Sequence, residues 1–411
     1  MPVQFRKTIA AALLVGLTPL AAVADETGTS AVTPTVGAPS TEHPMSLIQT
    51  RMRSSKLPAR TGLAALNPDG SPLWTSRAYE PFMPASTMKL ITATVALQLL
   101  GQDWKPVTRV NYDEASETLY LVGGGDTMLT SANLKTLAER TVATLAAING
   151  HVTTLKLDDT LFPAPTVAPG VKTSQQPQEL NPIRALMVDR RISMDSSKLA
   201  VQFFVSNLAN AGVHVSYAGR AKATGAEIVT FSGMRLQGAL RTMLWYSDND
   251  IAEAVFRLSS LAAGRTASWA DARLTAYEQL TKLGVPTKGL ELIDASGLSR
   301  NNRLTAFALS DVLRVAAAND RTKILRELLP TAGAEGTVRG RFHTKPSMCV
   351  QGTLKVKTGG LRDVVSLAGY APLADGTYRP FAIVVNNLHS VGEGNRARHA
   401  IDALAASFSG C

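Results

Sequence analysis

Ser86 and Lys89 stand three residues apart at the start of an apolar stretch, and no other serine of the chain has a lysine three positions later. On a helix, residues at this spacing share one face, with Cβ atoms about 5–6 Å apart. A lysine in a dry environment loses part of its preference for the charged form, so it can accept the serine proton. The pair therefore predicts a nucleophilic serine with a lysine base. Spacing alone leaves open an ordinary helix start whose lysine reaches solvent.

A second polar element is Ser247-Asp248-Asn249, which lies between two stretches of helical character, 236–246 and 251–261. Polar side chains at such a junction can face a cleft while the helices pack behind them. Taken alone, the triplet is equally typical of a helix cap.

A third element is Lys357-Thr358-Gly359, at the end of a predicted strand. A cation, a hydroxyl and a residue without a side chain suit the binding of an extended substrate that ends in a carboxylate. The alternative is an exposed strand end, where the lysine discourages pairing with other strands.

The elements that must position these residues come from both ends of the chain. A buried helix is predicted over 86–100, because this run is apolar on nearly every face and stops at Gly101. We expect a hairpin to open the folded part and three strands and a helix to close it, at 62–67, 73–78, 353–357, 364–370, 380–387 and 391–408. The pattern predicts an α+β fold with an antiparallel sheet flanked by helices, in a discontinuous domain.

The intervening region, from about 104 to 231, changes to mixed strands and short helices, which is typical of an inserted domain. The predicted organisation is a signal peptide, a flexible leader, a discontinuous catalytic domain and one insertion. The signal peptide covers 1–24 and the leader 25–43. The catalytic domain covers 44–105 with 231–411, and the insertion covers 106–230.

The order of the three elements is the signature shared by β-lactamases and penicillin-binding proteins. Further stretches narrow the resemblance: Leu121-Val-Gly-Gly-Gly-Asp126, Leu155-Lys-Leu-Asp-Asp-Thr-Leu-Phe162, Val188-Asp-Arg190, Asp294-Ala-Ser-Gly-Leu-Ser-Arg300, Asn302-Arg-Leu304 and Ser366-Leu-Ala-Gly-Tyr370. Over about residues 44–408 the chain resembles the D-alanyl-D-alanine carboxypeptidase/endopeptidase family, the low-molecular-mass class C penicillin-binding proteins.

The resemblance implies a serine acyltransferase that acts on peptidoglycan stem peptides and is inhibited covalently by β-lactam antibiotics. It implies that Ser86 is the nucleophile, Lys89 its base and Ser247 a proton relay to the leaving amine. It also implies a set of substrate-binding residues: Asn249 for the substrate amide, Lys357 and Thr358 for the terminal carboxylate, Gly359 beside them on the strand, and the N–H groups of Ser86 and Gly360 for the oxyanion.

Asp158 occupies the family's Asp/Phe stretch together with Phe162. By resemblance, this carboxylate would meet the free amine of a stem-peptide side chain. The alternative, a surface carboxylate beside a core phenylalanine, stays open.

The chain departs from the family pattern at three positions. Gly360 replaces the usual Thr or Ser, which removes a hydroxyl for the substrate carboxylate, and Arg362 is a candidate to compensate. Thr127 replaces the Pro after the Gly-Gly-Gly-Asp stretch, and Ala295 replaces a Gly. A non-catalytic, wall-binding scaffold is therefore one alternative. A β-lactamase is another, although no glutamate between Asn249 and Lys357 lies in the Glu-x-x-Leu-Asn context that class A enzymes use.

The net charge and the N-terminal residues indicate in which cell compartment the protein acts. The 42 Lys and Arg residues exceed the 32 Asp and Glu residues, and the formal net charge is +10. Arg6-Lys7, the apolar run 9–23 and Ala22-Val-Ala24 have the composition of a cleavable signal peptide; an uncleaved anchor is the alternative. The prediction is an exported protein, periplasmic, wall-associated or extracellular, with peripheral association to the wall or membrane surface. Export argues against nucleic acid as the partner of the basic surface.

Cys349 and Cys411 are the two cysteines of the chain. In an oxidising compartment they can form one disulfide, and the sequence leaves open a bridge or two thiols. No Cys/His spacing indicates a metal site, and no cofactor is expected.

Overall fold

The computed structural model describes residues 44–54, 57–58 and 60–411. The predicted signal peptide, 1–24, and leader, 25–43, lie outside the described residues. Among the described residues, no helix combines the length and apolar character that crossing a bilayer requires.

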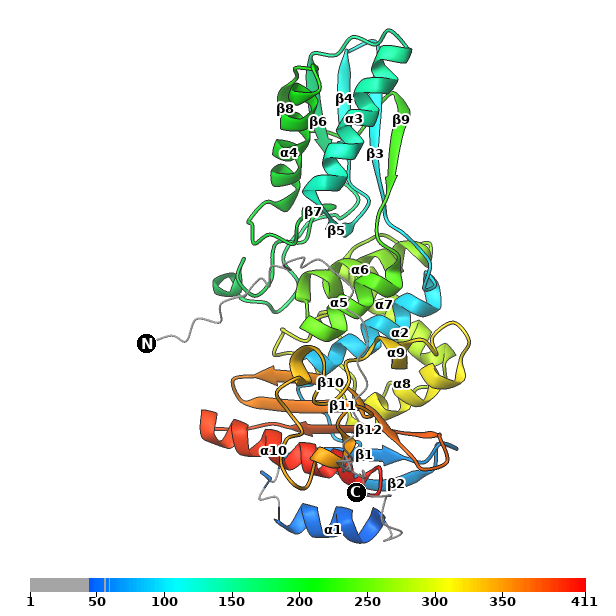
Figure 1. Cartoon of the computed structure of the whole chain (residues 1–411), viewed down its shortest axis with the longest axis vertical. Helices are drawn as coiled ribbons and strands as arrows, with labels where there is room; N and C mark the ends of the chain where they lie inside the picture. The colour runs from blue at the N-terminus through cyan, green and yellow to red at the C-terminus, as the bar shows by residue number, and fades with distance from the viewer. Residues whose placement is uncertain (1–43, 55–56, 59) are drawn as a thin grey trace, which may run out of the picture. The chain divides into compact units, whose positions relative to one another are not determined.

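The main sheet has five antiparallel strands in the order β10-β11-β12-β1-β2 (Figure 1). They are β1 (Thr61–Leu66), β2 (Pro72–Ser76), β10 (Lys355–Leu361), β11 (Val364–Pro372) and β12 (Tyr378–Val385). The first strand of the chain pairs with the last, with Thr61 opposite Val385. The predicted α+β fold, with an antiparallel sheet built from both ends of the chain, is confirmed.

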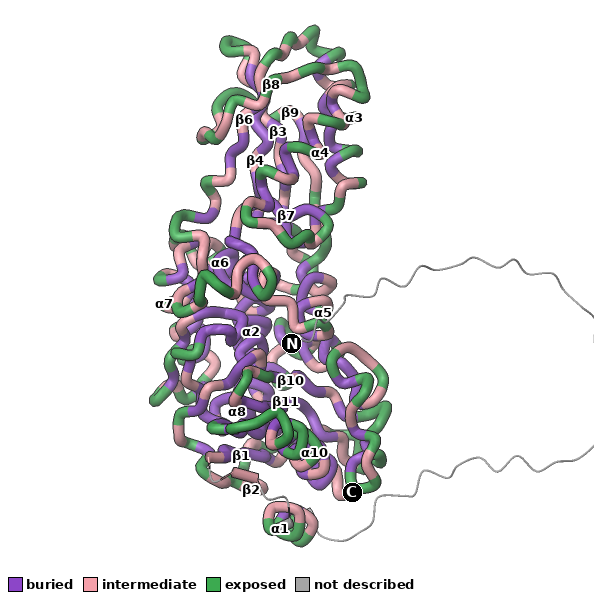
Figure 2. Tube along the Cα trace, turned by 90° about the vertical axis from the view of Figure 1, so that its left-hand side faces the viewer, coloured by how far each residue is buried: buried purple, intermediate pink, exposed green. Residues whose placement is uncertain are grey.

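The central strands are apolar throughout because both faces of the sheet are covered. Successive side chains of a strand point to opposite faces. In β11, Leu367 therefore joins the core beneath α10 (Val391–Ser407), while Ala368 joins the core beneath α2 (Lys89–Leu99) and α8 (Ala306–Ala318). In Figure 2, the colour for buried residues runs along β11. The sheet is thus the middle layer between two sets of helices.

The predicted hairpin is not the first element, because a helix, α1 (Pro44–Ser54), precedes it. This helix packs against α10, and Arg51 donates hydrogen bonds to the carbonyl oxygens of Ala403 and Cys411. The sequence signal was weak, since α1 carries polar residues around much of its circumference and depends on α10 for its packing.

Three further helices pack against α2: α5 (Leu236–Tyr246), α6 (Asn249–Ala262) and α7 (Trp269–Lys282). The short helix α9 (Leu325–Leu328) and the 3₁₀ turns η1 (Ala85–Met88), η3 (Gly336–Val338) and η4 (Met348–Val350) complete this part of the chain. As the composition predicted, every residue of α2 from Lys89 to Leu97 is buried. The helix is therefore a rigid support for what its first turn carries.

A second sheet lies within residues 107–232, with the order β8-β6-β4-β3-β9. Its strands are β3 (Val107–Asp113), β4 (Thr118–Val122), β6 (Thr154–Asp158), β8 (Ser216–Arg220) and β9 (Ala226–Ser232). Two helices, α3 (Ser131–Ala147) and α4 (Ser196–Asn210), share its core and are longer than the short helices expected. A parallel pair, β5 (Asp126–Leu129) and β7 (Leu186–Val188), and the turn η2 (Thr173–Gln175) complete the region. The domain boundaries at 105/106 and 230/231 stay predictions.

Cys349 and Cys411 form a disulfide with a Cα separation of 6.4 Å. The bridge joins η4 to Cys411, in the short segment after α10. Of the two alternatives that the sequence left open, the structure has the bridge.

Candidate active site

Ser86 lies in the 3₁₀ turn η1, directly before α2, and not in the first turn of an α-helix as predicted. The preceding residue, Ala85, has φ +48°, in the left-handed region that a residue with a Cβ seldom enters. The turn is held from two sides, because the hydroxyls of Thr87 and Ser366 both donate to the carbonyl of Pro84, each at 2.7 Å. Ser366 belongs to β11, so the main sheet fixes the turn that carries Ser86.

Gly359 allows β10 to lie directly against this turn. A Cβ added at Gly359 would stand 2.1 Å from Ser366 Oγ, 2.8 Å from Pro84 O and 3.0 Å from Ser86 N. Only a residue without a side chain fits at this position. The predicted strand end at Lys357 is therefore wrong: β10 continues to Leu361, paired with β11 throughout. Two consecutive glycines weaken a strand locally, and here tertiary packing overrides that tendency.

Lys89 is fully buried and its amine has three partners. Nζ donates to Asn249 Oδ1 at 2.8 Å and to the carbonyl of Ser296 at 2.7 Å, and it lies 3.2 Å from Ser86 Oγ. Burial lowers the pKa of Lys89 to about 8, although nearby carboxylates, Asp294 and Glu253 foremost, act in the opposite direction. A neutral amine is therefore accessible near neutral pH.

Ser247 lies at the end of α5, in the left-handed conformation with φ +57°. The next residue, Asp248, caps α6 by accepting a hydrogen bond from the backbone N–H of Ile251, and it forms an ion pair with Arg190. This arrangement turns Ser247 and Asn249 toward the two lysines. The alternative for this triplet, a helix cap, therefore holds for Asp248, which is the N-cap of α6.

Asn249 has a second contact. Its side-chain N–H donates to the backbone carbonyl of Glu179 at 2.7 Å. The NH2 group has two N–H donors, and this contact uses one of them.

Lys357, on β10, is the second buried lysine of the cluster. Its Nζ donates to Ser247 Oγ at 3.0 Å and to the carbonyl of Thr358 at 2.7 Å. Burial, followed by the positive charges of Lys89 and Arg341, lowers the pKa of Lys357 well below its ordinary value. The structure thus brings together Ser86, Lys89, Asn249, Ser247 and Lys357, from three separate parts of the sequence.

The two residues that flank Gly359 differ in solvent exposure: Thr358 is partly buried and Gly360 is exposed. The Thr358 hydroxyl is hydrogen-bonded to that of Thr337 at 2.7 Å. Gly360 is exposed; its φ is not positive, and a Cβ added there would meet no atom within 4 Å. Arg362, at the turn into β11, is exposed.

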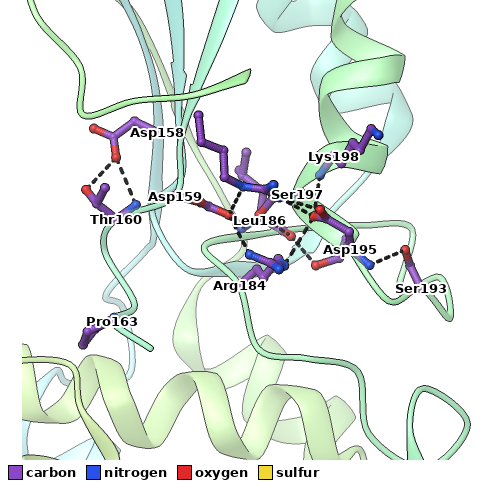
Figure 3. Close-up of polar contacts among 12 residues, drawn as sticks. Asp158, Asp159, Thr160, Pro163, Arg184, Leu186, Ser193, Asp195, Ser197 and Lys198 are labelled. Carbon is purple, nitrogen blue, oxygen red and sulfur yellow. Dashed lines mark hydrogen bonds and ion pairs between the residues drawn. The ribbon is translucent and has the colours of Figure 1, made fainter. Parts of the chain in front are cut away.

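Asp158 is the last residue of β6, and its carboxylate accepts hydrogen bonds from residues of the same region, among them Thr160 (Figure 3). One carboxylate oxygen accepts from the N–H and hydroxyl of Thr160, and the other accepts from the N–H of Ala223 at 2.8 Å. Among the described residues, no hydrogen bond joins Asp158 to the cluster around Ser86. Its role toward a stem-peptide amine stays a prediction.

Beside Asp158, Figure 3 shows a network of ion pairs around Arg184. Its guanidinium lies 3.2 Å from Asp159 and 3.3 Å from Asp195, and Arg220 contacts the same two carboxylates. The network joins the end of β6, the end of β8 and the start of α4, so its ion pairs hold these elements together.

Sequence reasoning missed the groups behind Lys89. Ser296 contributes its carbonyl, and Glu253, fully buried on α6, accepts hydrogen bonds from the backbone there. A signal was available: Glu253 follows Asn249 by one helical turn, within a stretch that is otherwise apolar.

The fold and the cluster define a class of enzyme, and comparison with known proteins identifies the family. The chain matches the D-Ala-D-Ala carboxypeptidase 3 (S13) family over residues 57–196 and 190–408. It is 30% identical to carboxypeptidase DacB of Mycolicibacterium smegmatis over 404 residues, which cover 87% of this chain and 86% of the relative. Among solved structures, penicillin binding protein 4 of Haemophilus influenzae superposes with a TM-score of 0.74 at 21% identity, covering 87% of this chain and 97% of the other.

The same Haemophilus protein, in complex with a β-lactam, superposes with a TM-score of 0.68 at 22% identity, covering 87% of this chain and 97% of the other. The protein is a peptidase with the penicillin-binding-protein fold. It belongs to the D-Ala-D-Ala carboxypeptidase 3 (S13) family, so the resemblance and the assignment as a D-Ala-D-Ala carboxypeptidase are confirmed. The family assignment does not favour the β-lactamase and scaffold alternatives.

Proposed function

We propose that the chain is an exported D-alanyl-D-alanine carboxypeptidase that acts through an acyl-enzyme on Ser86 and binds β-lactams covalently. The observation that carries the proposal is the position of Lys89, whose buried amine lies between Ser86 Oγ and Asn249 Oδ1. The substrate is the stem peptide of peptidoglycan, and cleavage of cross-links between stems is a second activity of the same site.

In the acylation step, Ser86 Oγ attacks the carbonyl carbon of the penultimate D-Ala and transfers its proton to Lys89. The N–H groups of Ser86 and Gly360 stabilise the oxyanion. The amide C–N bond then breaks, and the proton held by Lys89 passes by way of the Ser247 hydroxyl to the leaving D-Ala nitrogen, which leaves Lys89 neutral again. Water hydrolyses the Ser86 ester to complete the cycle.

Binding requires two further contacts. Asn249 holds the substrate amide, and Lys357 with Thr358 binds the terminal carboxylate. Lys357 has a second role in the proposal: its Nζ donates to Ser247 Oγ at 3.0 Å and so orders the relay hydroxyl.

The function is tested by incubating purified protein with a pentapeptide that ends in D-Ala-D-Ala and with a cross-linked muropeptide dimer, and measuring released D-Ala and monomer. We expect D-Ala release that stops after exposure to penicillin. Protein that is acylated by penicillin and yet releases neither product would contradict the proposal.

The Gly360 departure leads to a prediction about carboxylate binding. Gly360→Thr adds the hydroxyl usual in the family, at a position where an added Cβ meets no atom within 4 Å. We expect kcat/KM for D-Ala release to rise about tenfold or more, since a hydrogen bond to a charged group contributes about 1.5–3 kcal/mol.

The matched control is Gly360→Ala, which adds a Cβ without a hydroxyl and leaves kcat/KM near its original value. Equal rates for all three proteins would mean that Lys357 and Thr358 already saturate carboxylate binding.

A prediction about pH follows from Lys89. Because burial lowers the pKa of Lys89 to about 8, the amine is mostly protonated below that pH and cannot accept the Ser86 proton. The rate of acylation at saturating β-lactam should rise roughly tenfold per pH unit from about pH 6 and level off above about pH 8. Stopped-flow acylation with a chromogenic cephalosporin measures this profile, and a flat profile would exclude Lys89 as the base.

A further inference from the structure

Glu253, on α6, is a fully buried carboxylate whose function the catalytic roles above do not explain. Removing a carboxylate from water is costly unless other groups satisfy it. Glu253 Oε1 accepts from Ser296 N at 2.9 Å and from Ala295 N at 3.1 Å, and Oε2 accepts from Trp269 Nε1 at 2.8 Å. The carboxylate thus fixes the peptide segment 295–296 from behind.

The N–H groups of segment 295–296 bind Glu253, and its carbonyl groups point the other way, toward α2. The carbonyl of Ser296 accepts a hydrogen bond from Lys89 Nζ at 2.7 Å, while the carbonyl of Ala295 accepts one from the Thr92 hydroxyl. One helix, α6, therefore sets both acceptors of Lys89: Asn249 directly, and the Ser296 carbonyl through Glu253, one turn further along.

The two acceptors decide the direction of the Lys89 lone pair. A neutral amine has two N–H donors, and Asn249 Oδ1 and the Ser296 carbonyl can only accept. When both N–H groups point to these oxygens, the lone pair is left facing the third neighbour, Ser86 Oγ, at 3.2 Å. Proton abstraction needs this orientation.

We propose that Glu253 is a positioning residue for acylation, which fixes the Ser296 carbonyl and so directs the Lys89 lone pair at Ser86. This inference rests on the proposed function and extends it to a residue that touches neither substrate nor nucleophile.

The charges around Glu253 give the inference a pH signature. Asp294, in the loop after α7, Lys89, on α2, and Arg257, on α6 itself, are its charged neighbours; α7 contributes the uncharged Trp269. Burial, reinforced by Asp294, raises the pKa of Glu253 to about 7. The negative charge of Glu253 raises the pKa of Lys89, as do Asp294, Asp248 and Asp250. Removing the Glu253 charge must therefore lower the pKa of Lys89.

The test is Glu253→Gln, which keeps the shape of the side chain but replaces one acceptor oxygen by an NH2 group, which then faces either the backbone N–H groups of Ala295 and Ser296 or the indole N–H of Trp269. We expect acylation by a chromogenic cephalosporin to fall about 10–100-fold at its plateau, the scale of a small misplacement of a catalytic group. We also expect the midpoint of the pH profile to move to lower pH. The matched control is Glu291→Gln, at an exposed carboxylate, which leaves both readouts unchanged.

A second variant covers the case in which Glu253→Gln does not fold, as judged by circular dichroism. Trp269→Phe keeps an aromatic ring but removes the N–H donor to Glu253. This loss favours the protonated carboxyl, so the midpoint of the profile should move in the same direction.

The outcomes separate this inference from the proposed function. If the wild-type protein is not acylated on Ser86, the proposed function fails. If the wild-type protein is acylated and Lys89→Met is slow, but a folded Glu253→Gln has the original plateau or an unmoved midpoint, the positioning role of Glu253 alone is overturned.

Discussion

Replacing Ser86 by alanine is expected to abolish covalent labelling by penicillin and to reduce D-Ala release by about 10⁶-fold, the scale seen when a serine nucleophile is removed. The substitution takes away one oxygen atom from a half-buried turn that Thr87 and Ser366 hold in place. The fold should therefore persist. Mass spectrometry of intact protein and peptide mapping after exposure to labelled penicillin measure the adduct.

Ser206→Ala is the matched control, because Ser206 is exposed on α4. It should be labelled as fast as the unchanged protein. A persistent adduct in Ser86→Ala, mapped to another residue, would refute the assignment of the nucleophile.

The second large effect is expected for Lys89→Met. Methionine has a similar length and suits a buried site, so the variant keeps the packing of α2 while it loses the base. The acylation rate should fall by about 10²–10⁴-fold, the contribution of a general base. Rapid-mixing measurement of acylation, with thermal unfolding as a check of the fold, tests this result.

Removing the buried amine leaves Asn249 Oδ1 and the Ser296 carbonyl without their donor, so the variant should unfold at a somewhat lower temperature while it keeps the fold. Lys135→Met, at an exposed lysine on α3, is the control for loss of a positive charge. If Lys89→Met were acylated at the original rate, another group would have to activate Ser86.

The sequence predicted the parts of the site that depend on local spacing. Ser86 and Lys89 are one turn apart, and their proximity needs only the local backbone. The contacts of Lys89 with Asn249 and of Lys357 with Ser247 join distant parts of the chain. The order of motifs in the family resemblance indicated these contacts, and no physical rule applied to the residues alone could have done so.

Other features could not be predicted because they arise only in the folded chain. Gly359 suggested a strand end, yet close packing against the Ser86 turn keeps it inside β10. The resemblance predicted a role for Asp158 toward a substrate amine; its hydrogen bond from Thr160 is local, while the one from Ala223 joins distant parts of the chain. The carbonyl of Ser296 has no side-chain signature at all. Backbone acceptors of this kind are visible only in three dimensions.

The pairing of β1 with β12 has a consequence for how the enzyme matures. During synthesis, β1 emerges early, but its partner emerges only near the end of the chain, after the region that contains the second sheet. Contacts between residues so distant in sequence form slowly, and the unpaired strand is exposed in the meantime. Ser366 holds the turn that carries Ser86, and Lys357 lies on β10, so the cluster around Ser86 is complete only when the C-terminal strands have docked. A nascent chain therefore carries Ser86 without the neighbours that the proposed reaction needs.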